Sequence, residues 1–513
     1  MLAGGALAGA ITSRIAPALR GPTKNLDDKP NVIIFLLDAL RADHLGCYGY
    51  RRNTAPNIDR IAAEGTRFEN AHASSAVTFQ SMMSLHTSYE YPSFDPTYER
   101  RPLVDFPTFP EVFKREGWHT KTLTANPWHY ACSWNTRGYA QEDILIPEPY
   151  LDRNNEWIEW WCAEAALKQA RDKMFSNLQQ PFMWYIHLMP PHEPYAPSDR
   201  FMRRFGCEYE GQLPEDVYSH PVDLRKHLDM LSAEDVRHVV DLYDANILSG
   251  DWFVGAIVSR LEWLDILDDT IVVVTSDHGE EFREHGGFGH DGTVYQEDVR
   301  IPLVFRYPKR VLAAKVVTDL VSMIDIAPTI LELAGIPMQF GRGKSMVPML
   351  SRSRYPGHRD RAFSDCLGIA MRKGDIKCIC YDWPVDATEG KWRRGLGPSL
   401  ATEVYDLCRD PTESRNLAGR DPALEAELVE DVKSWVESNA ALGPSDPRAV
   451  PKWNEELLRE MHMTLRGKQG RGEDVDIKQL FFADKHLAPD ADGGIDPETR
   501  ERLKALGYIG DTR

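Results

Sequence analysis

Four short apolar segments, each running into a polar side chain, constrain the fold of this chain more than any other feature. The first is Asn31–Leu37 (NVIIFLL), and the others are Lys121–Ala125 (KTLTA), Phe182–Leu188 (FMWYIHL) and Thr270–Thr275 (TIVVVT). Continuous apolar runs of this length are typical of strands buried on both faces of a parallel sheet. Helical patterns lie between them, at Ala55–Glu64 and Ser232–Leu267. The alternation predicts an α/β fold with a doubly wound, mainly parallel sheet.

The polar residues that follow these strands point to a functional site. They are Asp38, Asn126, His192 and the pair Asp277-His278. In an open α/β sheet, ligands bind outside the carboxyl ends of the strands. Four strands therefore deliver candidate chemistry to one edge of the predicted sheet.

The pattern changes after about residue 350, where short strands are expected in Ala362–Cys380 and Glu403–Leu407, followed by a helix at Pro422–Ser438. This pattern predicts a smaller α+β subdomain that follows the larger domain in the chain. The expected organisation is a disordered leader at 1–28, a catalytic domain at 29–350, an antiparallel C-terminal subdomain at 351–440, and a linker and tail at 441–513.

The charge of the chain limits its partners. The formal net charge is −18, so the surface repels polyanions, and nucleic acid is not expected as a partner. No apolar run reaches the roughly 18 residues that a membrane span requires. Met1–Ala10 has no basic residue before its apolar part, which predicts a cytoplasmic protein as written; export would require a start further upstream. The sequence leaves the oligomeric state open.

Four ordered blocks resemble the sulfatase-like branch of the alkaline phosphatase superfamily. They are NVIIFLLDALRADHLGCYGY from Asn31, YIHLMPPHEPY from Tyr185, SDHGEEFREHGGFGHDGTVYQEDVRIPL ending at Leu303, and EVYDLCRDPTESRNL from Glu403. The blocks cover roughly residues 30–420 in the order found in that family. The resemblance implies a metal-dependent hydrolase that cleaves a small anionic sulfate, phosphate or phosphonate ester.

Asp38, Asp277 and His278 provide two hard oxygen ligands and an imidazole, which suits a divalent cation. Many sulfatases have Asp-Asp at the first position, whereas here the second residue is Ala39. The loss of a hard ligand beside a retained histidine favours Mn²⁺ or Zn²⁺ over Ca²⁺. The sequence therefore predicts one divalent metal held by Asp38, Asp277, His278 and the hydroxyl of Thr78, and leaves a second ion open.

Thr78 occupies the nucleophile position of the resemblance. Sulfatases carry C-x-P-S-R or S-x-P-S-R, whose first residue becomes formylglycine, and the lead-in Phe68–Ala73 aligns that motif with Thr78-Phe79-Gln80-Ser81-Met82. Only Ser81 is retained, so formylglycine cannot form here. The Thr78 hydroxyl is similar to the threonine nucleophiles of phosphodiesterases in this superfamily, where a cation lowers the hydroxyl pKa. The alternative is that Thr78 caps a helix at Phe79–Leu85.

Further histidines complete the predicted catalytic set. The resemblance makes His192 a ligand of the substrate anion and His290 the acid that protonates the leaving group. His285 in the same loop is the competitor for the acid role. His187 lies within a predicted strand and is expected to be a packed core histidine.

Asn126 is similar in position to an oxyanion-binding asparagine of threonine-type phosphodiesterases, and the alternative is a turn residue. The lysine that sulfatases carry at this strand end is missing. Arg41 and Asp43 are expected to brace the first loop.

Three functions are consistent with these residues. The first is a hydrolase of sulfate or phosphate/phosphonate esters with Thr78 as the nucleophile. The second is a catalytically inactive sulfatase-like binding module, and retention of Asp38, Asp277, His278 and His192 argues against it. The third is a phosphotransferase that uses the same threonine.

Overall fold

The computed structural model describes residues 29–90, 106–124, 126, 137–140, 144–145, 171–206, 209–211, 213, 231–290, 292–336, 338–352, 355, 357–366, 368–381 and 401–440. The leader predicted at 1–28 and the linker and tail predicted at 441–513 lie outside these residues.

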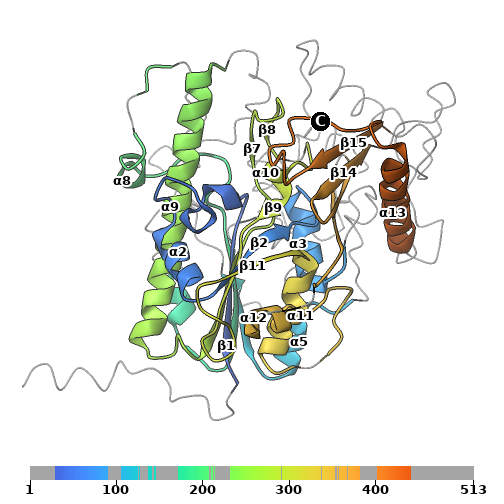
Figure 1. The fold of residues 1–513 in the computed structure, drawn as a ribbon. Coiled ribbons are helices and arrows are strands. Elements are labelled where there is room, and N and C mark those ends of the chain that lie inside the picture. Colours follow the sequence, from blue (N-terminus) through green and yellow to red (C-terminus); the bar gives the residue numbers. More distant parts are fainter. Residues whose placement is uncertain are drawn as a thin grey trace, which may run out of the picture.

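A central, mainly parallel sheet forms the body of the molecule (Figure 1). Its strands, in order across the sheet, are β11 (Lys315–Ser322), β2 (Thr66–His72), β10 (Leu303–Arg306), β6 (Thr270–Thr275), β1 (Asn31–Leu37), β5 (Phe182–Leu188), β3 (His119–Thr124) and β4 (Ile144–Leu145). The short β9 (Arg300–Ile301) pairs with β2. Only β10 runs antiparallel to both of its neighbours. The predicted fold class is confirmed.

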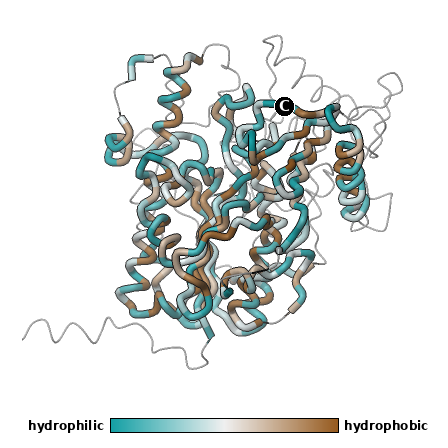
Figure 2. The backbone as a smooth tube through the Cα atoms, in the orientation of Figure 1, coloured by the Kyte–Doolittle hydropathy of each residue, from teal (hydrophilic) through white to brown (hydrophobic). Residues whose placement is uncertain are grey.

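Helices cover both faces of this sheet because β1 is apolar on both of its sides. Ile33, Phe35 and Leu37 belong to the same buried cluster as apolar residues of α2 (Pro56–Ala63) and α9 (Ala233–Trp263). The alternate residues Val32, Ile34 and Leu36 share a second cluster with residues of α3 (Thr78–Thr87), α5 (Phe109–Arg115), α11 (Ile326–Leu333) and α12 (Val347–Ser351). Figure 2 shows the hydrophobic colour concentrated along the central strands between these layers.

The remaining short elements lie near the carboxyl edge of the sheet or connect its layers. They are η1 (Ala42–His44), η2 (Gly46–Tyr48), α8 (Asp199–Met202), β7 (Glu281–Phe282), β8 (Phe288–Gly289), α10 (Gln296–Val299) and η6 (Met323–Asp325). The strands β7 and β8 form a two-stranded antiparallel ribbon. This ribbon follows directly after the polar end of β6.

A second, antiparallel sheet follows in the chain. It consists of β12 (Arg361–Asp365), β13 (Ile369–Lys373), β14 (Ile376–Tyr381) and β15 (Ala401–Asp406). The helix α13 (Pro422–Ala440) covers one face of it, where Leu428, Val432 and Trp435 pack on Met371 and Cys378 (Figure 1). The predicted smaller C-terminal subdomain is therefore present as a sheet with one helix.

A buried ionic cluster fixes the segment that leads into the second sheet. Asp325, fully buried at the end of η6, accepts hydrogen bonds from Nη2 and Nε of Arg359 at 2.5 and 2.9 Å. His358 Nε2 lies 3.2 Å from the same carboxylate. Burial opposes ionisation of Asp325, but Arg359 and His358 lower its pKa to about 2.

Candidate active site

The carboxyl ends of four adjacent strands, β6, β1, β5 and β3, meet at one edge of the central sheet. Asp38 follows β1, and Asp277 and His278 follow β6 after Ser276. Asn126 lies just beyond β3. All of these side chains are fully buried. The sheet therefore brings together the polar strand ends expected from the sequence.

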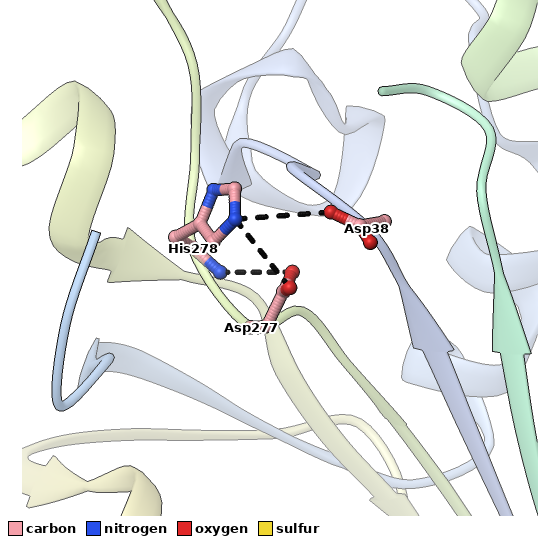
Figure 3. A group of neighbouring side chains, drawn as sticks. All are labelled: Asp38, Asp277 and His278. Atoms are coloured by element: carbon pink, nitrogen blue, oxygen red, sulfur yellow. Dashed lines mark hydrogen bonds and ion pairs between the residues drawn. The ribbon is translucent and has the colours of Figure 1, made fainter. Parts of the chain in front are cut away.

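Asp38, Asp277 and His278 form a group with the spacing of metal ligands (Figure 3). One ligand atom from each residue lies within 4.8 Å of the other two. His278 Nε2 is 3.7 Å from Asp38 Oδ1 and 3.4 Å from Asp277 Oδ2. In the part of the chain that the structure describes, no second group of His, Cys, Asp or Glu has this spacing.

In each of the three candidate ligands, one polar atom of the side chain already forms a hydrogen bond with another part of the protein. Asp38 Oδ2 accepts two side-chain hydrogen bonds. Asp277 Oδ1 accepts from the backbone N–H groups of Ala39 and His278, at 3.1 and 3.0 Å. His278 Nδ1 is 2.9 Å from the Gly279 carbonyl. Asp38 Oδ1 and Asp277 Oδ2 are buried without a hydrogen-bond partner, and such groups are rare unless they bind an ion or water. The residues fit a divalent cation.

The charges at this site are strongly interdependent. Burial raises the pKa of Asp277, and the Asp38 carboxylate raises it further. Burial also disfavours the ionised form of Asp38, yet the rings of His192, His187 and His278 hold its pKa well below the ordinary range. Two carboxylates in one buried site repel each other unless a proton or cation lies between them.

Ala39 stands where many sulfatases have a second aspartate, and it contributes backbone geometry instead of a ligand. Its φ angle is +58°, in the left-handed region that costs an alanine energy. This conformation accompanies the hydrogen bond from its N–H to Asp277 and the one from Leu40 N to Ser276 Oγ at 2.8 Å. The turn after β1 is thereby tied to the end of β6.

Thr78 is the first residue of α3, and its hydroxyl lies 3.0 Å from His278 Nε2. The alternative prediction, that Thr78 caps this helix, is wrong. The N-cap residue is Val77, and no side chain caps the helix there. The side chain of Thr78 faces the metal-ligand group because α3 begins one residue earlier than expected.

Ser81, the one retained residue of the nucleophile motif, has a structural contact. Its hydroxyl donates to the Ser75 carbonyl at 2.8 Å and accepts from the Ser75 N–H at 3.2 Å. The loop that precedes Thr78 is thus closed onto the first turn of α3. This contact is independent of which residue occupies position 78.

The C-terminal sheet holds the same loop from its other side. Asp365 N donates to the Ser74 carbonyl at 2.9 Å, and Ser364 Oγ donates to the Ala73 carbonyl at 2.6 Å. Asp365 also forms an isolated parallel bridge with Ser75. The loop that precedes Thr78 therefore runs between α3 and the edge strand β12.

His192 and His290 lie beside the ligand group. The His290 ring stacks on His278 with centroids 4.3 Å apart, and His192 meets His290 edge-on at 4.8 Å. His192 donates through Nδ1 to the Glu193 carbonyl at 2.6 Å. Its Nε2 is buried without a hydrogen-bond partner among the described residues. The two predicted substrate histidines thus lie on one side of the ligand group.

His285, the competitor for the acid role, is engaged elsewhere. Nδ1 lies 2.5 Å from Glu297 Oε1, and Nε2 is 3.3 Å from the Glu413 carbonyl. Its ring stacks on Tyr295 at 3.6 Å. Burial opposes protonation of His285, but Glu297 raises its pKa to about 9. The Glu413 contact ties His285 to the C-terminal subdomain.

Arg41 and Asp43, in the loop after β1, have the contacts expected of residues that brace this loop. Arg41 Nε and Nη2 bind both oxygens of Asp43, at 3.0 and 2.8 Å. Arg41 also donates to the Glu280 carbonyl at 3.0 Å and to Glu284 at 2.6 Å. The loop after β1 is thus joined to the segment after His278.

The contact of His187 with Asp38 was not predicted from the sequence. His187 is buried in β5, as expected of a core residue, but its Nε2 lies 2.9 Å from Asp38 Oδ2. Asn126 Nδ2 donates to the same oxygen at 2.8 Å, so at least one of its N–H groups serves Asp38. Its oxyanion role stays a prediction. The signal that could have revealed His187 is its place one residue before the end of a strand next to β1.

No helix among the described residues is both long and apolar enough to cross a bilayer.

Comparisons with known proteins identify the family of this chain. The sulfatase family matches residues 30–336, and the family described as N-sulphoglucosamine sulphohydrolase, C-terminal, matches residues 283–440. Arylsulfatase K of Canis lupus familiaris is 25% identical, over 88% of this chain and 89% of its own length.

Two solved structures share the fold. The crystal structure of phosphonate monoester hydrolase of Agrobacterium radiobacter has a TM-score of 0.60 at 18% identity, covering 80% of this chain and 96% of that one. A protein solved with its substrate D-glucosamine-2-N,6-O-disulfate has a TM-score of 0.61 at 21% identity, covering 83% and 100%. The sulfatase match covers more than half of the chain, and the chain therefore belongs to the sulfatase family of hydrolases.

Proposed function

We propose that this protein is a metal-dependent hydrolase of phosphate, phosphonate or sulfate esters that uses Thr78 as its nucleophile. The observation that carries the proposal is the 3.0 Å contact between Thr78 Oγ1 and His278 Nε2. This contact puts a hydroxyl within hydrogen-bond distance of one atom of the group that Asp38, Asp277 and His278 form. A nucleophile and three ligand atoms in one buried group are the arrangement that activated hydroxyl catalysis needs.

Thr78, His290 and His192 each have a role in the proposed reaction. The Thr78 hydroxyl gives up its proton to solvent, and its oxygen attacks phosphorus or sulfur as the bond from that atom to the leaving oxygen breaks. His290 supplies a proton to the leaving oxygen, and Nε2 of His192 binds an oxygen of the ester anion. In the second step water gives one proton to His290 and attacks the same phosphorus or sulfur atom, and the Thr78 oxygen leaves and takes up a proton from solvent. Asp38, Asp277 and His278 would hold a divalent cation, which would supply Lewis acidity to lower the hydroxyl pKa and neutralise developing charge.

The residue type at position 78 favours phosphorus chemistry. A formylglycine hydrate has two hydroxyls on one carbon, so the second can expel a bound sulfate by breaking a carbon–oxygen bond. Threonine has one hydroxyl, so its ester is released only by a second attack at sulfur or phosphorus. Met82 and Asn126 also replace the arginine and lysine of the sulfatase pattern.

The ligand set favours Mn²⁺ or Zn²⁺ over Ca²⁺. Ca²⁺ takes 6–8 oxygen ligands, often with bidentate carboxylates. Here an imidazole nitrogen replaces one oxygen, Ala39 replaces a carboxylate, and each remaining carboxylate has one oxygen held by the protein. Imidazole suits Zn²⁺ and carboxylates suit Mn²⁺.

The relatives support an anionic ester as the substrate class. One structural neighbour is named a phosphonate monoester hydrolase, and another was solved with a sulfated glucosamine as its substrate. The name of the first supports a phosphorus ester as one candidate substrate.

The proposal is tested with purified full-length chain, stripped of metal and reloaded with Mn²⁺, Zn²⁺ or Ca²⁺. Rates are measured on 4-nitrophenyl sulfate, phosphate, phenylphosphonate and bis(4-nitrophenyl) phosphate. We expect turnover of at least one phosphorus ester with Mn²⁺ or Zn²⁺, lost on chelation. Metal binding without turnover of any ester would favour the inactive binding module instead.

A further inference from the structure

The two oxygens of Asp38 have different surroundings. Oδ2 accepts hydrogen bonds from His187 Nε2 at 2.9 Å and Asn126 Nδ2 at 2.8 Å. Oδ1 accepts none and lies 3.7 Å from His278 Nε2, on the side of the ligand group. Because an ionised carboxylate only accepts hydrogen bonds, His187 must carry its proton on Nε2.

One donor lies within the sheet, and the other lies in the turn that follows β3. His187 pairs with Leu36 of β1 on one side and with Thr124 of β3 on the other. The Asn126 N–H donates to Thr124 Oγ1 at 3.1 Å, which fixes the turn after β3. Both side chains are almost completely shielded from solvent. His187 therefore cannot move aside without disturbing the paired strands, and the Thr124 contact holds the backbone of Asn126.

We infer that His187 and Asn126 are positioning residues that restrict Asp38 to a single ligand oxygen and thereby set the affinity and choice of the metal. This inference rests on the proposed function, because it assumes that Asp38 binds a cation. Hydrogen bonds to the non-ligating atoms of metal ligands fix their orientation, and their loss typically costs about 10- to 100-fold in metal affinity.

The arrangement predicts a specific change in selectivity. With both donors present, Asp38 offers one oxygen, which suits a small ion with few ligands. Without them, the carboxylate can rotate and offer both oxygens, which is a common mode for Ca²⁺. Removal of a donor should therefore weaken Mn²⁺ binding more than Ca²⁺ binding.

Two variants at position 187 and a buried control test this. His187→Leu removes the donor, whereas His187→Gln retains an N–H at a similar distance from the backbone. His86→Leu is the matched control. His86 is equally buried and packs on Tyr185, which lies two residues before His187 in β5. Its Nδ1, however, donates to the Met82 carbonyl and not to Asp38. The measurements are the Mn²⁺ and Ca²⁺ dissociation constants of metal-stripped full-length protein, by calorimetry.

We expect His187→Leu to bind Mn²⁺ about 10- to 100-fold more weakly, with a lower ratio of Mn²⁺ to Ca²⁺ affinity. His187→Gln and His86→Leu should stay within a few-fold of wild type. A folded His187→Leu variant with unchanged dissociation constants would overturn the inference. Should His187→Leu fail to fold, Asn126→Ala, which changes a loop residue, is measured by the same criteria.

The experiment also separates this inference from the proposed function. A wild-type chain that binds neither ion would overturn the metal site itself, and the inference with it. A wild-type chain that binds Mn²⁺ while His187→Leu and Asn126→Ala bind it equally well would overturn only the positioning role.

Discussion

The Glu280 carboxylate lies 3.2 Å from Nδ1 of His290, and both side chains are buried. Because the carboxylate accepts, Nδ1 donates the hydrogen bond. The ring is also held flat against His278 at 4.3 Å. Glu280 therefore fixes His290 in one orientation beside the ligand group, as a general acid requires.

Replacement of His290 should affect substrates according to their leaving groups. His290→Ala removes the proton donor, so alkyl esters with poor leaving groups should slow by about 10²- to 10⁴-fold. Esters of 4-nitrophenol should slow far less, since that leaving group needs no proton. Rates on matched alkyl and 4-nitrophenyl esters test this, with His285→Ala as the control. Equal losses on both substrate types would indicate a structural role for His290.

Replacement of Thr78 separates a nucleophile from a structural residue. Thr78→Ala should lower kcat by several orders of magnitude while the metal and the fold are retained. Since Val77 is the N-cap of α3, the change should cost little stability. Thr78→Ser should retain substantial activity because it keeps a hydroxyl. The measurements are kcat, metal content and melting temperature.

A Thr78→Ala variant with the wild-type rate would contradict covalent catalysis and leave water as the attacking group. Mass spectrometry of the quenched enzyme provides a second criterion, since a covalent intermediate adds mass to the peptide that contains Thr78.

Loss of either Asp277 or His278, the two candidate ligands that follow β6, should abolish metal binding. Asp277→Ala and His278→Ala each remove one of three converging ligand atoms, so both should lose bound metal and turnover together. Metal content by atomic absorption and ester hydrolysis are measured on the same preparations. Stoichiometric metal with a normal rate in either variant would contradict the assignment of ligands.

The Asp325 cluster should make stability depend on pH. The folded pKa of Asp325 is about 2, below the unfolded value of about 3.9. Its contribution, about 2–3 kcal/mol, is therefore present above pH 4–5 and is lost as the pH falls toward 2. The free energies of unfolding of wild type and Asp325→Asn, from urea titrations, should differ clearly at pH 7 and less at pH 3. An equal difference at both values would contradict this assignment.

The central strands could be predicted from the sequence to the residue. Asn31–Leu37, Phe182–Leu188 and Thr270–Thr275 are buried on both faces. A strand in that environment is apolar at most of its positions, so these three runs stand out from the polar segments around them. The strand predicted at Lys121–Ala125 begins instead at His119, because His119 and Thr120 pair with Phe182 and Met183 of β5 although both are polar.

The contacts within the site were harder to predict from the sequence where a side chain has two possible partners. Thr78 could cap a helix or face His278, and only the position of β6 relative to α3 decides this. His187 has the pattern of a core residue, and its bond to Asp38 depends on the order β1–β5 in the sheet. Sequence patterns report burial and periodicity, but they do not report which strands are neighbours.

The hydrogen bonds from Ser364 and Asp365 to the Ala73–Ser74 backbone have a consequence for how this enzyme acquires its activity. Residues nearly three hundred positions apart must meet before the segment that carries Thr78 is held on both sides. A chain still emerging from the ribosome, with the central sheet complete but β12 not yet made, would lack that support. Hydrolytic activity should therefore arise late in synthesis, after the C-terminal sheet has docked.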